Sequence, residues 1–144
     1  MIQEIIDNIY IGDWQDAVRF EREFSDIFTV AFDSQYKGNH FYHLVDGPYS
    51  DNELTLIYAI SDLVETRRKL NNKEKILVHC IAGISRSPAV IIGYMIVVYG
   101  YDVDDALSYV KRIRVMANPI PELMILLKNY EYRLRHNDWI NEMI

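Results

Sequence analysis

The segment from Lys75 to Met95 constrains the fold more than any other part of the chain. It opens with an apolar run, Lys75–Val78, that is typical of a buried strand. A short loop containing glycine and serine follows, and the segment closes with Pro88–Met95, which reads as a helix. A buried strand that passes through a short loop into a helix is the building unit of an α/β layer. The segment therefore predicts an α/β fold.

The elements around this segment agree with that fold class. Strands alternate with helices before it, and helices dominate after it, so we predict a short, mostly parallel central sheet flanked by helices, with a helical C-terminal half. We find no repeat, low-complexity tract or linker, and expect residues 1–144 to form a single domain. The expected strands are a pair over 2–11, then 27–32, 41–45 and 75–78; the expected helices are 14–23, one from 50 or 51 to about 70, 87–99, 103–115 and 121–136.

Several helix boundaries carry local signals. Asp13 can cap the first helix, with Asp16 at the capping-box position. Ser50 or Asp51 can cap the second, Gly100 can end the third, and Asp102 can cap the fourth. In the second helix an apolar face is expected from five side chains with helical spacing: Leu54, Ile57, Ile60, Leu63 and Val64.

Composition and charge exclude several classes of protein. The net charge of −6 argues against sequence-independent nucleic-acid binding, which depends on clustered cations. The basic groups, such as Lys111, Arg112 and Arg114, read as solvated helix faces. No apolar run reaches membrane-spanning length, and the N-terminus lacks the pattern of a signal peptide. We expect a cytoplasmic protein with no membrane partner.

The single cysteine, Cys80, excludes an internal disulfide and a multi-cysteine zinc site. It also argues against a thiol oxidoreductase, which needs a second cysteine to resolve its intermediate. His40, His43 and His136 have no cysteine or carboxylate partners at metal-binding spacing. We therefore expect neither a metal nor a cofactor.

The loop around Cys80 has the chemistry of an anion site. A loop that enters a helix directs backbone N–H groups and the positive end of the helix dipole at one point. Cys80 stands at the start of that loop and Arg86 at its end. The field favours a thiolate nucleophile, and a guanidinium can hold two oxygens of a tetrahedral oxyanion. This pattern indicates covalent handling of phosphate.

The segment His79–Ser87 resembles the signature of the protein tyrosine phosphatase superfamily. Within it, Ala82–Ser87 resembles the dual-specificity branch. Ile9–Gly12 with Asp16 and Ala17, the loop at Asp46, the helix carrying Tyr94 and Met95, and Asn118–Pro119 are further matches. The resemblance extends from about Ile5 to Tyr130, and it implies a compact, single-domain catalytic phosphatase.

The resemblance implies a two-step mechanism. Cys80 attacks the phosphorus and becomes a cysteinyl-phosphate, Arg86 binds the phosphoryl oxygens, and Ser87 assists the sulfur as leaving group. His79 is implied to hold the loop in shape, and Asn118 to support it through side-chain hydrogen bonds. The backbone N–H groups implied to bind the phosphoryl oxygens belong to Ile81, Ala82, Gly83, Ile84, Ser85 and Arg86.

Two aspartates are candidates for the general acid that protonates the leaving group. Asp46 directly follows the apolar strand predicted to end at Val45, where the family places its acid. Asp51 stands at the start of a helix and is accounted for as a cap. We favour Asp46 and keep Asp51 as the alternative.

The resemblance implies phosphorylated proteins as substrates. The loop positions Ile81, Ala82, Ile84 and Ser85 add no positive charge, which favours a phosphoprotein over a multiply charged substrate. We expect phosphotyrosine as the substrate, and the resemblance to the dual-specificity branch implies activity on phosphoserine and phosphothreonine as well. The alternatives are a phosphatase of RNA 5′ ends or phosphoinositides, and a module that only binds phosphoproteins. The sequence leaves the oligomeric state open.

Overall fold

The computed structural model describes residues 1–136, so the last eight positions of the predicted domain lie outside the described residues. Five strands form one sheet in the order β1-β2-β5-β3-β4. Only β1 runs antiparallel to its neighbour, which confirms the mostly parallel sheet. The strands are β1 (Gln3–Ile6), β2 (Ile9–Gly12), β3 (Asp26–Thr29), β4 (His40–Phe41) and β5 (Ile76–His79).

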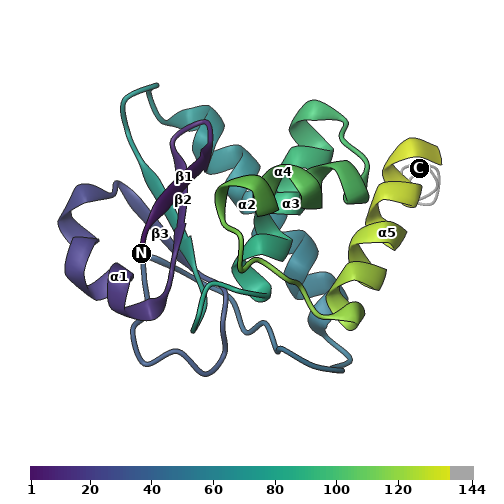
Figure 1. Cartoon of the computed structure of the whole chain (residues 1–144), viewed down its shortest axis with the longest axis horizontal. Coiled ribbons are helices and arrows are strands. Elements are labelled where there is room, and N and C mark those ends of the chain that lie inside the picture. The colour runs from purple at the N-terminus through teal and green to yellow at the C-terminus, as the bar shows by residue number, and fades with distance from the viewer. Residues whose placement is uncertain (137–144) are drawn as a thin grey trace.

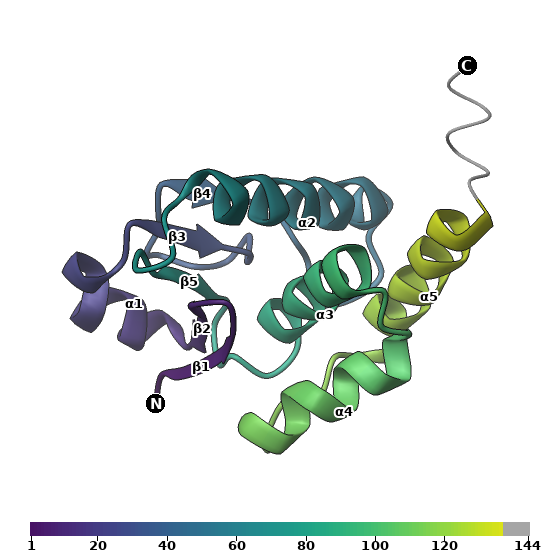
Figure 2. The same cartoon turned by 90° about the horizontal axis from the view of Figure 1, so that it is seen from above.

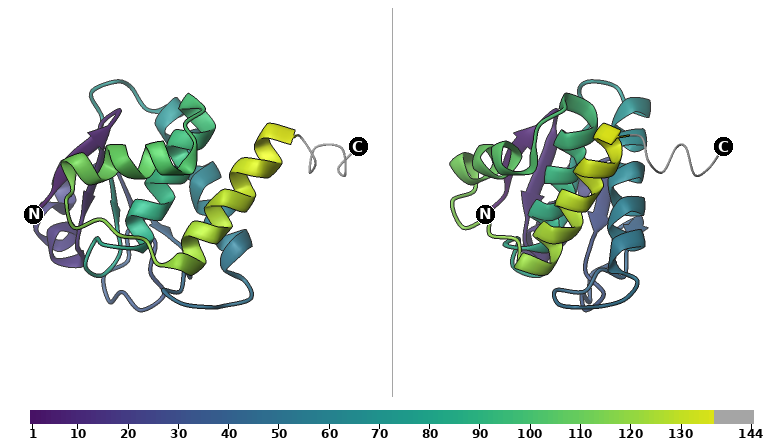
Figure 3. Two further views of the ribbon diagram at one scale, coloured as in Figure 1. Left: turned by 45° about the vertical axis from the view of Figure 1, so that its right-hand side comes forward. Right: turned by 90° about the vertical axis from the view of Figure 1, so that its right-hand side faces the viewer.

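The helices cover both faces of this sheet. In Figure 2, α1 (Trp14–Phe20) lies on one side, and α2 (Asn52–Lys69) and α3 (Arg86–Tyr99) lie on the other. α4 (Val103–Ile113) and α5 (Pro121–His136) pack against α3, and α5 lies on the side of the molecule away from the sheet (Figure 3). The predicted helical C-terminal half is confirmed.

Alternation along β5 explains how the two faces are filled. Ile76 and Val78 join the main core beneath α2 and α3, while Leu77 points to the opposite face and joins a smaller cluster with Ala17 of α1. Successive side chains of a strand point to opposite faces, so a strand buried on both sides needs a continuous apolar run. α3 is buried along most of its length, which fixes its N-terminus beneath the loop that follows β5.

Most of the local boundary signals are confirmed. Asp13 and Asp16 form a reciprocal capping box at the start of α1. Gly100 ends α3 in a left-handed conformation, and the Asp102 side chain caps α4. The turn between β1 and β2 contains Asp7 and Asn8, both with a positive φ.

Other boundaries were wrong. β3 ends at Thr29 instead of residue 32, and β4 covers two residues in place of the strand predicted over 41–45. Leu44 does not continue β4, because its carbonyl accepts hydrogen bonds from the Phe32 N–H and from the Arg86 side chain. The first helix becomes a 3₁₀ turn after Phe20, and the fourth ends at Ile113.

The start of α2 also differs from the prediction. Asp51 occupies the position before the helix, but its side chain makes no capping hydrogen bond. Leu54 is exposed, so the buried face comprises Leu56, Ala59, Ile60 and Leu63. In residues 1–136 no helix combines the length and apolarity needed to cross a bilayer.

Candidate active site

Cys80 directly follows the carboxyl end of β5 and lines a cavity. The cavity holds about 330 Å³, and its lining comes from the loop between β5 and α3, the segment between β4 and α2 and the segment before α5. The backbone of the loop after β5 and of the segment before α5 lies below α3 in Figure 1. Ligands of open α/β sheets bind outside the carboxyl ends of the strands. The lining residues are Asp46, Cys80, Ile81, Ala82, Ile84, Ser85, Arg86, Asn118 and Ile120.

Cys80 is buried, and its Sγ lies 3.3 Å from the hydroxyl oxygen of Ser87. Ser87 is itself fully buried in the first turn of α3. The hydroxyl is therefore placed to donate a hydrogen bond to a sulfur that carries negative charge. Sulfur and hydroxyl lie at the N-terminus of α3, where the helix dipole stabilises an anion.

His79 connects the loop to the neighbouring strand. Its Nε2 lies 2.7 Å from the Thr29 hydroxyl, and its Nδ1 lies 2.9 Å from the carbonyl oxygen of Cys80. Because a carbonyl only accepts, Nδ1 carries the hydrogen and Nε2 accepts from Thr29, which in turn accepts from the N–H of Gly38. Burial lowers the pKa of His79, which favours the neutral ring. His79 thus fixes the Cys80 peptide group.

The guanidinium of Arg86 is buried and only partly hydrogen-bonded. Its Nη1 donates to Asp33 at 2.7 Å and to the Leu44 carbonyl at 3.2 Å. Its Nε is buried without a hydrogen-bond partner. A buried polar atom without a partner is costly, and an oxyanion in the cavity would supply the missing acceptor.

Arg114 was predicted to lie on a solvated helix face, but it is only 1% exposed. Its Nε donates to the Gly83 carbonyl at 2.7 Å, and Nη2 contacts the Ala82 carbonyl at 3.4 Å. Nη1 donates to the Met1 carbonyl and to the Gln3 side chain. Arg114 therefore anchors the back of the loop to the N-terminal strand.

Two other segments bond to the loop carbonyls. The Ile81 carbonyl accepts from the N–H of Trp14, and the Ile84 carbonyl accepts from the N–H of Asn118. Together with Arg114, these bonds turn four consecutive carbonyls away from the cavity. In a trans peptide the N–H points opposite to the carbonyl, so the N–H groups of residues 82–85 turn toward the cavity. Asn118 contacts the loop through its backbone N–H, although its side chain was predicted to support the loop.

Asp46 and Asp51 lie in different environments. Both aspartates are exposed, but Asp46 lines the cavity with Cys80 and Arg86, whereas Asp51 is absent from the lining. Asn52, buried at the start of α2, exchanges two hydrogen bonds with the backbone of Val45 and donates a third to the Gly47 carbonyl. The backbone on both sides of Asp46 is thereby fixed.

Sequence reasoning missed Asp33, Asn52 and Arg114. Asp33 and Arg114 act across 53 and 31 positions of the chain. Asn52 directly follows Asp51, which already accounted for the predicted start of the helix. In the sequence only their residue types were visible. An arginine or asparagine indicates a role in a site only when its burial is known.

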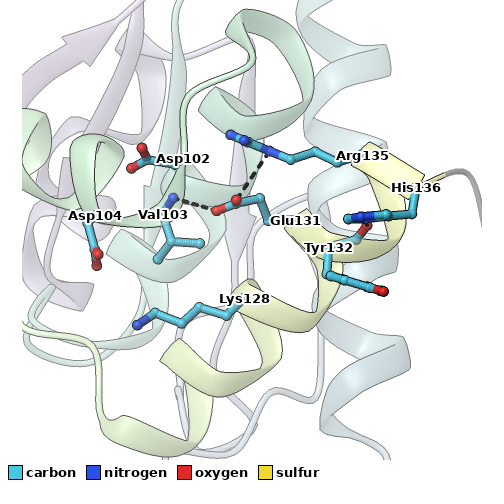
Figure 4. A pocket seen from close by; sticks show the side chains of 8 residues that line it. All are labelled: Asp102, Val103, Asp104, Lys128, Glu131, Tyr132, Arg135 and His136. Atoms are coloured by element: carbon cyan, nitrogen blue, oxygen red, sulfur yellow. Dashed lines mark hydrogen bonds and ion pairs between the residues drawn. The ribbon is translucent and has the colours of Figure 1, made fainter.

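A larger hollow of about 560 Å³ lies between the start of α4 and the end of α5 (Figure 4). Within this hollow the Glu131 carboxylate accepts a hydrogen bond from the N–H of Val103 and pairs with Arg135 (Figure 4). It contains neither Cys80 nor Arg86. Within residues 1–136, no group of three or more His, Cys, Asp or Glu side chains is arranged to hold a metal ion.

A comparison with models of protein families shows to which family the chain belongs. The model of the dual specificity phosphatase catalytic domain matches residues 9–133. The chain belongs to this family. As a dual specificity phosphatase-like member of the tyrosine phosphatase superfamily, it is a cysteine-dependent protein phosphatase.

Individual proteins that are similar to this chain are also named as phosphatases. A protein of Invertebrate iridescent virus 6, named as a candidate tyrosine phosphatase, is 29% identical over 89% of this chain and 90% of its own length. Human protein phosphatase Slingshot homolog 2 is 30% identical over 93% of this chain, which spans only 10% of that relative.

Solved structures show the same fold. Human DUSP28 superposes with a TM-score of 0.78 at 22% identity, covering 93% of this chain and 95% of its own. The human tyrosine phosphatase-like serine/threonine/tyrosine-interacting protein gives 0.74 at 24% identity, covering 91% and 95%. The predicted phosphatase fold is confirmed.

Proposed function

We propose that the protein hydrolyses phosphotyrosine, and also phosphoserine and phosphothreonine, through a phosphocysteine intermediate on Cys80. The observation that carries this proposal is the placement of Cys80, Arg86 and Asp46 around one cavity of about 330 Å³. A nucleophile, an anion-binding guanidinium and a proton donor that share one cavity are the groups a phosphomonoester hydrolase requires.

In the first step the Cys80 thiolate attacks the phosphorus, the S–P bond forms, and the bond to the leaving oxygen breaks. The N–H groups of residues 82–85 and the free Nε edge of Arg86 bind the non-bridging oxygens. Asp46 gives its proton to the leaving oxygen. Phosphoryl transfer depends on positioning and charge stabilisation, so the rigid anchoring of the loop supplies a large share of the rate.

In the second step water attacks the phosphocysteine, and Asp46, now ionised, accepts its proton. The S–P bond breaks and sulfur leaves as thiolate. The Ser87 hydroxyl, 3.3 Å from the sulfur, stabilises that charge by a hydrogen bond. His79 takes no proton in either step, because both ring nitrogens are held by Thr29 and the Cys80 carbonyl.

The cavity lining supports a singly phosphorylated protein substrate. Among the residues that the structure describes, Arg86 is the one cationic side chain in this lining. A phosphoinositide with several phosphates would leave its further charges unpaired. The apolar side chains of Ile81, Ile84 and Ile120 line the same cavity and can pack against the ring of phosphotyrosine.

The test compares wild type with Cys80→Ser, Asp46→Asn and Asp51→Asn on p-nitrophenyl phosphate and a phosphotyrosine peptide. Cys80→Ser should abolish turnover and the acid-quenched phosphoenzyme detected by mass spectrometry. Asp46→Asn should lower the rate on the peptide about 10²–10⁴-fold, and less on p-nitrophenyl phosphate, whose leaving group needs less protonation. Asp51→Asn, the matched control, should stay within about threefold. Turnover by Cys80→Ser would refute the covalent mechanism, and a larger loss in Asp51→Asn would reassign the acid.

A further inference from the structure

A second hollow adjoins the cavity above Cys80. It holds about 280 Å³ and is lined by Trp14, Asp33, Gln35 and Ile81. Ile81 lies in the walls of both hollows, and Asp33 bonds to Arg86 at 2.7 Å. Whatever occupies the second hollow is therefore a neighbour of the phosphoryl group.

The walls of this hollow are fixed before a substrate arrives. Trp14 is the first residue of α1, and its N–H donates to the Ile81 carbonyl at 3.1 Å. The capping box formed by Asp13 and Asp16 holds the helix start in place. On the opposite wall, the bond to Arg86 orients the Asp33 carboxylate. A preformed hollow binds a side chain without the cost of ordering its own walls.

The chemistry of the lining suits a cation. Trp14 presents a partly exposed indole (37%), and the Asp33 carboxylate is 44% exposed. No cationic side chain of the described residues lines the hollow. Once a phosphoryl group occupies the free edge of Arg86, the negative charge of Asp33 is less compensated than in the empty site. A guanidinium stacks on an indole and donates to a carboxylate at the same time.

We propose that this hollow is a subsite for a cationic side chain, arginine before lysine, one or two residues from the phosphorylated residue of a peptide substrate. The proposal rests on the proposed phosphatase function and names the substrate class more narrowly. In an extended peptide each residue advances by about 3.3 Å, so a side chain two positions away lies about 7 Å along the substrate. Because Ile81 lies in the walls of both hollows, neighbouring side chains of one short peptide segment can enter both.

The experiment uses phosphotyrosine peptides that differ only at the two positions on each side of the phosphoresidue, with arginine, lysine, alanine, leucine or glutamate there. At low salt we expect kcat/KM to be roughly three- to thirtyfold higher with arginine than with alanine at one of these positions, and lowest with glutamate. Raising the ionic strength should reduce the contrast between arginine and glutamate.

Two variants locate the effect. Trp14→Ala should bring the arginine-to-alanine ratio of kcat/KM toward one, and Gln35→Lys should invert the preference between arginine and glutamate. Tyr58→Ala removes an aromatic side chain that is 61% exposed on α2, and Asn72→Lys adds a charge in the turn before β5. Both controls should leave the ratios unchanged.

The outcomes separate the two proposals. Equal rates for all peptides, a preference for leucine over arginine, or an arginine preference that survives in Trp14→Ala would overturn the subsite and leave the phosphatase function intact. Turnover of p-nitrophenyl phosphate without hydrolysis of any phosphopeptide would overturn the protein-phosphatase function and the subsite with it.

Discussion

Replacing Gly83 by alanine tests whether the shape of the phosphate loop controls activity. Gly83 has a φ of +69°, and a Cβ at this position would lie 2.7 Å from the Gly12 carbonyl oxygen and 2.5 Å from Nη2 of Arg114. Neither neighbour can move freely, because one is backbone and the other is a buried side chain with four hydrogen bonds. The loop itself must shift.

Gly100→Ala is a matched control. Gly100 has nearly the same φ, +70°, but a Cβ there meets no atom within 4 Å. Its substitution therefore measures the backbone cost of a left-handed alanine alone, roughly 1 kcal/mol or a little more. For a chain of this size that is a decrease in Tm of about 2–4 °C.

Gly83→Ala carries the same backbone cost and adds the two overlaps. Overpacking in a close-packed site costs typically ~1–3 kcal/mol. We expect the free energy of unfolding to fall by about 2–4 kcal/mol, at least twice the loss in Gly100→Ala. A loop displaced by about 1 Å should also lower kcat/KM by on the order of 10²-fold.

The assay is hydrolysis of p-nitrophenyl phosphate at a temperature where thermal melts show both variants folded, with the free energy of unfolding taken from urea titrations. Gly100→Ala should keep wild-type kcat/KM. If Gly83→Ala keeps it as well, or if the two variants lose the same stability, then the contacts of Gly83 with Gly12 and Arg114 do not control the loop, and the reasoning fails.

Two further predictions concern the groups that support the site. The folded-state pKa of His79 lies below its ordinary value of 6.5, so the unfolded chain binds a proton more readily. The contribution of His79 to the free energy of unfolding is present above pH 6.5 and is lost as the pH falls from there through the folded-state pKa. Urea titrations from pH 7.5 downward should show this loss in the wild type and a smaller loss in His79→Gln. Asn52→Ala should lower the rate on a phosphotyrosine peptide about tenfold by releasing the backbone around Asp46, with a smaller effect on p-nitrophenyl phosphate; equal effects on both substrates would contradict a role in placing the acid.

The sequence predicted what is encoded locally. The strand, loop and helix around Cys80 are contiguous, and so are the capping box at Asp13 and the helix end at Gly100. Each rests on backbone preferences of a few neighbouring residues. Asp46 is favoured over Asp51 on a local feature as well, its position after an apolar run, and the assignment of the acid stays a prediction.

The sequence could not predict what depends on distant partners. The segment 41–45 has the apolar residues of a strand, yet the Leu44 carbonyl bonds to Arg86, 42 positions away. Arg114 looks like any helix-end cation until its burial is known. Tertiary contacts of this kind override local propensity and leave no periodic pattern.

Burial also explains how an acidic chain forms an anion site. Arg86 and Arg114 are 5% and 1% exposed, so water and salt screen their charges far less than those of surface carboxylates. All four hydrogen bonds of Arg114 go to carbonyl oxygens, so no bonded carboxylate cancels its charge. Arg86 does have a carboxylate partner, but Asp33 is 44% exposed and its charge is partly screened. The potential at the loop is therefore set by two buried cations and the N-terminus of α3, and the net charge of −6 does not oppose a phosphoryl group there.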